Sequence, residues 1–101
     1  MHGFQVSSAG TPDWAALLRG VDAEAVSLDM PITLASHEAD PINGEGAWLA
    51  VLRGRVGGAP ALLLLQYHDD DRDCVPLRLS ELVRTDDGLL YVRQLWEFRP
   101  E

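Results

Sequence analysis

Three groups of polar residues have side chains that can bind metals or catalyse reactions. The first is Asp69-x-Asp71-x-Asp73, whose carboxylates have the spacing of the first ligands in a calcium loop. Such a loop requires glycine at its sixth position and glutamate at its twelfth, where this chain has Cys74 and Ser80. We therefore predict an acidic turn that lies in solvent or contacts a partner.

The second group combines imidazole and carboxylate side chains. His37 is followed by Glu38 and Asp40, and His68 is followed by Asp69. Two histidines and a carboxylate suit zinc and related metals. The spacing matches no metal-binding motif, and His68 would have to reach across a predicted sheet. We therefore predict no metal and no cofactor.

The third group contains a thiol and a glycine-rich stretch. Cys74 follows His68 across the acidic turn, but an active cysteine needs a positive environment. The stretch RGRVGG at 53–58 falls at a predicted hairpin tip, whereas phosphate-binding glycines join a strand to a helix. We therefore predict that this chain is not an enzyme.

These side chains must be positioned by the ribbon Ala47–Tyr67, two apolar, β-prone runs on either side of Gly57-Gly58. Paired glycines between such runs predict a two-residue hairpin turn, because the favoured turns need positive φ. Both faces of the ribbon are largely apolar, so we expect a helix on one face and further chain or a partner on the other. The predicted pairs are Val56 with Ala59, Leu52 with Leu63, Ala50 with Leu65 and Trp48 with Tyr67.

A short helix is predicted after Thr11, which we expect to be its N-cap. Its apolar residues recur at helical spacing and predict one buried stripe: Trp14, Leu17, Leu18 and Val21. Alternation over Val26–Leu34 predicts a half-buried strand at a sheet edge, and Ala35–Gly46 is expected to be a polar loop.

The C-terminal half continues in strands. We expect a short strand at Val75–Leu79, a helical turn at Ser80–Val83 and a last strand at Leu89–Phe98. In that last strand, strict alternation would place Leu90, Val92, Trp96 and Phe98 on one face.

Length and composition indicate a folded protein. The chain has 101 residues, of which 47% are hydrophobic and 24% are charged, values typical of one globular domain. We expect a single compact domain over residues 1–101, with 1–10 as a loose lead-in. The fold class is α+β, mainly an antiparallel sheet of about four to five strands with one short N-terminal helix. We see no signal peptide and no membrane-spanning run, and expect a cytoplasmic protein.

The charge restricts the partners. The chain has sixteen acidic residues, eight arginines and no lysine, with a net charge of −8. Nucleic acid and anionic membrane are poor partners for such a surface, whereas a basic protein is complementary to it. The absence of lysine is typical of the GC-rich genomes of bacteria and their phages.

Two functions of different classes fit these observations. The first is a small acidic interaction module, similar in role to an inhibitor, an immunity protein or an antitoxin, that binds a basic protein through clustered carboxylates. The alternative is a homodimeric regulatory or small-ligand-binding domain that uses an apolar face of the sheet. The partner-binding candidates for the first function are Asp69, Asp70, Asp71, Asp73, Glu38, Asp40 and Glu45.

Overall fold

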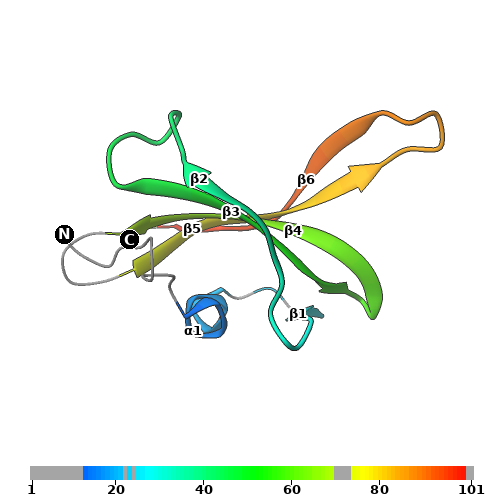
Figure 1. Ribbon diagram of the computed structural model, residues 1–101, viewed down its shortest axis with the longest axis horizontal. Coiled ribbons are helices and arrows are strands. Elements are labelled where there is room, and N and C mark those ends of the chain that lie inside the picture. Colours follow the sequence, from blue (N-terminus) through cyan, green and yellow to red (C-terminus); the bar gives the residue numbers. More distant parts are fainter. Residues whose placement is uncertain (1–12, 22, 24, 70–73, 100–101) are drawn as a thin grey trace.

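The computed structural model describes residues 13–21, 23, 25–69 and 74–99. Within them one short helix and six strands form an α+β fold, and the strands form one antiparallel sheet (Figure 1). This confirms the predicted class, with six strands in place of four to five. The elements are α1 (Trp14–Arg19), β1 (Val26–Leu28), β2 (Leu34–Ala39), β3 (Ala47–Val56), β4 (Ala59–Asp69), β5 (Cys74–Arg84) and β6 (Leu90–Glu97).

The hairpin of β3 and β4 forms the middle of the sheet. Gly57 and Gly58 have φ of 61° and 85°, values that glycine adopts without steric cost. The observed register matches the predicted one at every pair, including Trp48 opposite Tyr67 and Val56 opposite Ala59. The strand order is β1-β3-β4-β5-β6, and β2 also pairs with β3. β1 and β2 therefore share one edge of the hairpin, and β6 forms the other edge.

The structure of residues 26–46 differs from the predicted single strand followed by a loop. The expected strand Val26–Leu34 ends at Leu28, and β2 begins at Leu34 and continues into the segment predicted to be loop. Pro31, which cannot donate a ladder hydrogen bond, lies in the break between the two strands. β2 forms because the free edge of β3 accepts it, with Leu34 opposite Leu52 and His37 opposite Ala50.

The predicted helical turn at Ser80–Val83 is wrong, because β5 runs unbroken through it. Ser80 pairs with Leu64 of β4 on one side and with Gln94 of β6 on the other, and this pairing outweighs a local capping signal. The register between β5 and β6 shifts after Leu79, which lies opposite Trp96. Trp96 is therefore on the opposite face from that predicted by strict alternation.

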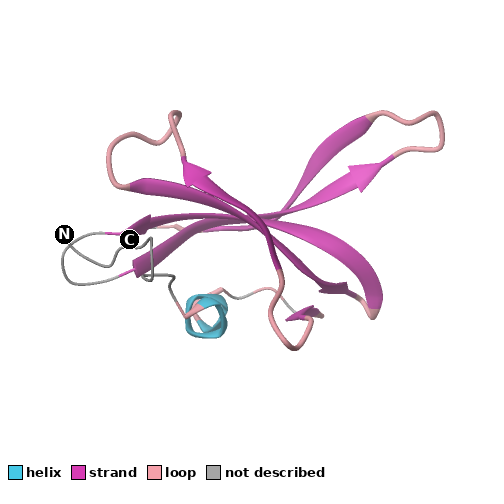
Figure 2. Cartoon of the chain, in the orientation of Figure 1, coloured by secondary structure: helices cyan, strands magenta, loops and turns pink. Residues whose placement is uncertain are grey.

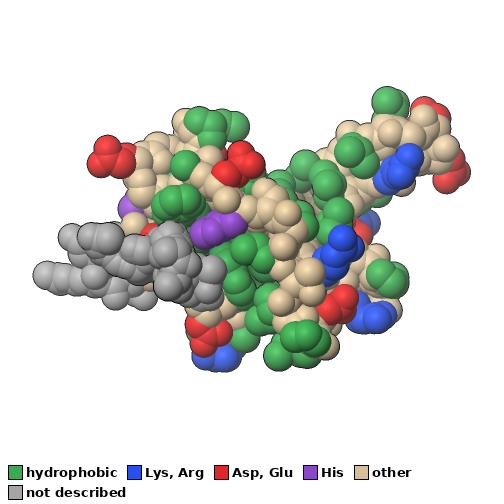
Figure 3. Space-filling model, in the orientation of Figure 1, with side chains coloured by type: hydrophobic (Ala, Val, Ile, Leu, Met, Phe, Trp, Pro, Cys, Tyr) green, Lys and Arg blue, Asp and Glu red, His purple; other side chains and the backbone are tan. Residues whose placement is uncertain are grey.

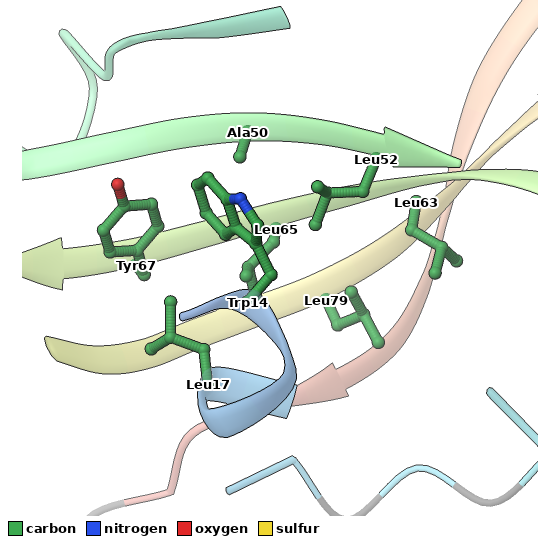
Figure 4. Packing of buried hydrophobic residues seen from close by; sticks show 8 residues of the cluster. All are labelled: Trp14, Leu17, Ala50, Leu52, Leu63, Leu65, Tyr67 and Leu79. Carbon is green, nitrogen blue, oxygen red and sulfur yellow. The ribbon is translucent and has the colours of Figure 1, made fainter. Parts of the chain in front are cut away.

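The core lies between α1 and one face of the sheet (Figure 2). Asp13, and not Thr11, is the N-cap, since its carboxylate accepts a hydrogen bond from the backbone N–H of Ala16 at 3.1 Å; Thr11 itself is outside the described residues. Figure 4 shows Trp14 and Leu17 pointing from the helix toward the sheet. Full burial of one such leucine contributes about 1.5–3 kcal/mol. The cluster comprises Trp14, Leu17, Ala50, Leu52, Leu63, Leu65, Tyr67 and Leu79.

The other face of the sheet is also apolar but only half-buried. Within the described residues α1 is the one helix, and it packs on the core face. No helix in this part of the chain has the length and apolar character needed to span a membrane. The half-buried apolar residues that alternate with the core positions are Leu49, Val51, Leu62, Leu64 and Leu82.

Candidate functional site

The fold brings two acidic segments to the same end of the sheet. The backbone N–H of Asp69 donates to the carbonyl of Gly46 at 2.9 Å, and Nε2 of His68 lies 3.2 Å from the carbonyl oxygen of Glu45. Asp69, at the end of β4, is therefore a neighbour of the β2–β3 loop. We call Glu38, Glu45 and Asp69 with their surroundings the acidic end.

Asp40 is a buried hydrogen-bond acceptor at the acidic end. Its side chain is only 4% exposed, and its carboxylate accepts from the Ile42 N–H at 2.9 Å, Asn43 Nδ2 at 2.6 Å and Gln66 Nε2 at 3.1 Å. Burial would raise the pKa of Asp40, but these hydrogen bonds outweigh it and hold the pKa below its ordinary value. Asp40 therefore anchors the loop to β4, and little of its surface is available to a partner.

The other candidates differ in exposure. Glu38 and Glu45 are exposed, and Asp69 is half-buried and accepts a hydrogen bond from Cys74 Sγ at 3.3 Å. Asp70, Asp71 and Asp73 lie outside the described residues. The structure thus brings Glu45 and Asp69 together, and Glu38 belongs to the adjoining strand β2.

The arginines lie elsewhere. Segments 34–52 and 56–69, which include the residues of the acidic end, contain no arginine or lysine, and Figure 3 shows none on the β2–β3 loop. The ion pairs found within the described residues join Arg55 to Asp29, Arg78 to Glu97 and Arg93 to Glu81. No arginine in the described part of the chain is paired with Glu38, Glu45 or Asp69, so the negative field at this end is not neutralised by these residues.

An aromatic cluster that the sequence analysis missed lies beside the acidic end. Nε2 of His37 is 2.7 Å from Oη of Tyr67, and the two rings are stacked with an interplanar angle of 14°. Trp14 meets both rings edge-on, and Trp48 lies 5.2 Å from His37 between ring centroids. Burial lowers the pKa of His37 and, together with the charges of Cys74 and Asp69, raises the pKa of Tyr67. Tyr67 has no exposed surface and His37 is half-buried, and their hydrogen bond holds β2 to β4.

The metal and nucleophile candidates are dispersed. Across 13–21, 23, 25–69 and 74–99, no three histidine, cysteine or acidic side chains gather as metal ligands. His37 lies on the core face and His68 on the opposite face, which their partners Ala50 and Val75 show. Gly57 and Gly58 form the hairpin turn, where Gly58 accepts a hydrogen bond from Arg55 at 3.1 Å. This tip is not a strand–helix junction of the kind that binds phosphate.

No protein-family model, curated protein or solved structure matches this chain.

Proposed function

We propose that the chain is a small acidic protein-interaction module that binds a basic protein partner, in the manner of an inhibitor, immunity protein or antitoxin. The observation that supports this most is the proximity of Glu45 to Asp69, with no arginine or lysine in the described segments 34–52 and 56–69 that carry them. In the sequence Asp69 is followed by Asp70, Asp71 and Asp73, with Arg72 among them, which adds a net charge of −2.

The physical basis of binding is long-range attraction followed by local packing. Clustered charges of one sign steer a complementary surface toward the acidic end and raise the association rate. Asp40 holds the loop that carries Glu45 in place. The carboxylate of Glu45 can therefore contact a partner with little loss of conformational entropy on binding. Trp48, half-buried at the same end, supplies an aromatic surface for tighter contact.

The experiment is capture of partners from the lysate of the source organism at low and at moderate salt, with identification of the captured proteins. We expect a basic protein whose affinity falls steeply as salt rises, because exposed charges are screened over about 10 Å at 0.1 M salt. Binding that is indifferent to salt over this range contradicts the proposal.

A pair of variants then localises the contact. Glu38→Gln with Glu45→Gln should weaken binding of the captured partner by about 3- to 30-fold, if each exposed charge contributes about 0.3–1 kcal/mol. The matched control is Asp86→Asn with Asp87→Asn, which removes the same charge at the exposed β5–β6 turn. Equal weakening by both pairs would mean that net charge, and not the acidic end, governs binding.

The second candidate function is a regulatory or ligand-binding domain that uses the half-buried apolar face. Leu49, Val51, Leu62 and Leu64 support it, because no described helix covers them. If this face binds a second copy or an apolar ligand, Val51→Glu should abolish that binding. The circular dichroism spectrum of the variant must match that of the unchanged protein for the result to count.

A further inference from the structure

The two halves of the edge strand β6 have different surroundings. Its first half belongs to the β5–β6 arm, which extends from the body of the sheet in Figure 1. Here apolar side chains are exposed, with Leu90 at 63%, Tyr91 at 49% and Val92 at 52%, and Figure 3 shows apolar atoms along the arm. An exposed edge of this length with apolar side chains is a template for pairing with another strand.

The second half of β6 lies beside an open hollow of about 590 Å³. Its apolar lining comes from Leu95, Trp96 and Phe98, and Gly20 at the end of α1 forms another wall. Arg99 and Glu97 also line the hollow and add one charge of each sign. The hollow therefore adjoins the strand β6, whose outer edge pairs with no other described strand and carries the exposed apolar residues.

We propose that β6 is the interface of a homodimer, in which the β6 edges of two copies pair antiparallel about a twofold axis. In such an arrangement the first half of each strand lies beside the second half of the other. Tyr91 of one copy then approaches the hollow of the other, whereas Leu90 and Val92 lie on the opposite side of the joined sheets, and the same contact occurs twice.

Two details of the edge favour a second copy over an unrelated partner. The register shift after Leu79 places Trp96 on the same face as Tyr91, so antiparallel pairing brings the two aromatic rings to one side of the joined sheets. The turn before β6 is acidic at Asp86 and Asp87, whereas Arg99 follows the strand. Glu97, which lies beside Arg99, is paired with Arg78. Antiparallel pairing therefore brings Asp86 and Asp87 of one copy toward Arg99 of the other, whereas parallel pairing would bring the two acidic turns together.

This interface is away from the acidic end and does not depend on the function proposed above. The test is the mass of the full chain at micromolar concentration by light scattering after size exclusion, with sedimentation equilibrium for the dissociation constant. We expect twice the monomer mass of 11.1 kDa. A monomer over this range, or a dimer that only Val51→Glu on the other face dissociates, overturns the proposal.

Substitutions at exposed positions can weaken the dimer without unfolding the protein, and so they test the interface by itself. Leu90→Glu with Val92→Glu should raise the dimer dissociation constant by roughly tenfold or more, because it places like charges in an apolar contact. Ile42→Glu is the matched control, since Ile42 is 87% exposed in the β2–β3 loop, and we expect its dimer to be unchanged. Equal weakening by the control and the double variant would contradict an interface at β6.

Discussion

Nε2 of His37 lies 2.7 Å from Oη of Tyr67, and this hydrogen bond joins β2 to β4 across the intervening strand β3. It ties an edge strand to a residue of the core, so the segment that carries Glu38 is held to the centre of the sheet.

Tyr67→Phe should lower the free energy of unfolding by about 1–2 kcal/mol. The change removes one hydrogen-bonding group and leaves Nε2 of His37 without its partner in a half-buried site. Chemical denaturation measures the loss. Tyr91→Phe, at an exposed tyrosine, is the control; it keeps the ring that the proposed β6 contact uses and should stay within about 0.5 kcal/mol. Equal effects of the two changes would show that the hydrogen bond contributes little.

The stability of the protein should fall as the pH is lowered from 7 toward 5, in part because of His37. Burial depresses the folded-state pKa of His37 below its ordinary value of 6.5. At a pH between the folded and unfolded pKa values of His37, the unfolded state binds more protons than the folded state. The stability that depends on neutral His37 is therefore fully present above pH 6.5 and is lost as the pH falls through the folded-state pKa. Thermal unfolding across this range should show a smaller decline in His37→Gln. A decline in His37→Gln as steep as that of the unchanged protein would contradict this role of His37.

Asp40→Ala should destabilise the protein by about 2–3 kcal/mol, because hydrogen bonds to a charged group are strong and the change leaves Asn43 and Gln66 unpaired. The pKa of Asp40 is held below its ordinary value of 3.8, so its contribution is present above that pH and is lost in stronger acid. Glu45→Ala, at an exposed carboxylate of the same loop, should change stability by about 0.5 kcal/mol or less. Denaturant titration at pH 7 measures both variants.

Gly54→Ala should destabilise the protein by about 1–3 kcal/mol through steric conflict. A Cβ at this position would lie 2.4 Å from the backbone oxygen of Ser27 and 2.7 Å from Cδ1 of Leu63, so β1 or the core must move. Gly20→Ala is the control, because its Cβ would meet its nearest neighbours at 3.5 Å. If Gly54→Ala were as stable as the control, β1 would not pack closely against β3.

The parts of the sheet that could be predicted from the sequence are those specified by residues close together in the chain. The glycine pair at 57–58 and the apolar runs beside it predict both the hairpin and its register, since the turn determines which residues face each other. The stretches 34–39 and 80–83 were mispredicted, because their strand conformation depends on partners distant in the sequence, Leu52 and Leu64 among them. Their local polar and capping residues indicated loop and helix.

The sequence by itself determined the turn at Gly57-Gly58, the short helix and the excess of negative charge, because each depends on residues that are neighbours in the chain or on composition alone. Only the tertiary structure decided that Glu45 lies beside Asp69, that Asp40 is buried and that His37 contacts Tyr67. These relationships arise from pairing between strands far apart in sequence. Burial and proximity depend on that pairing, which no short stretch of residues specifies.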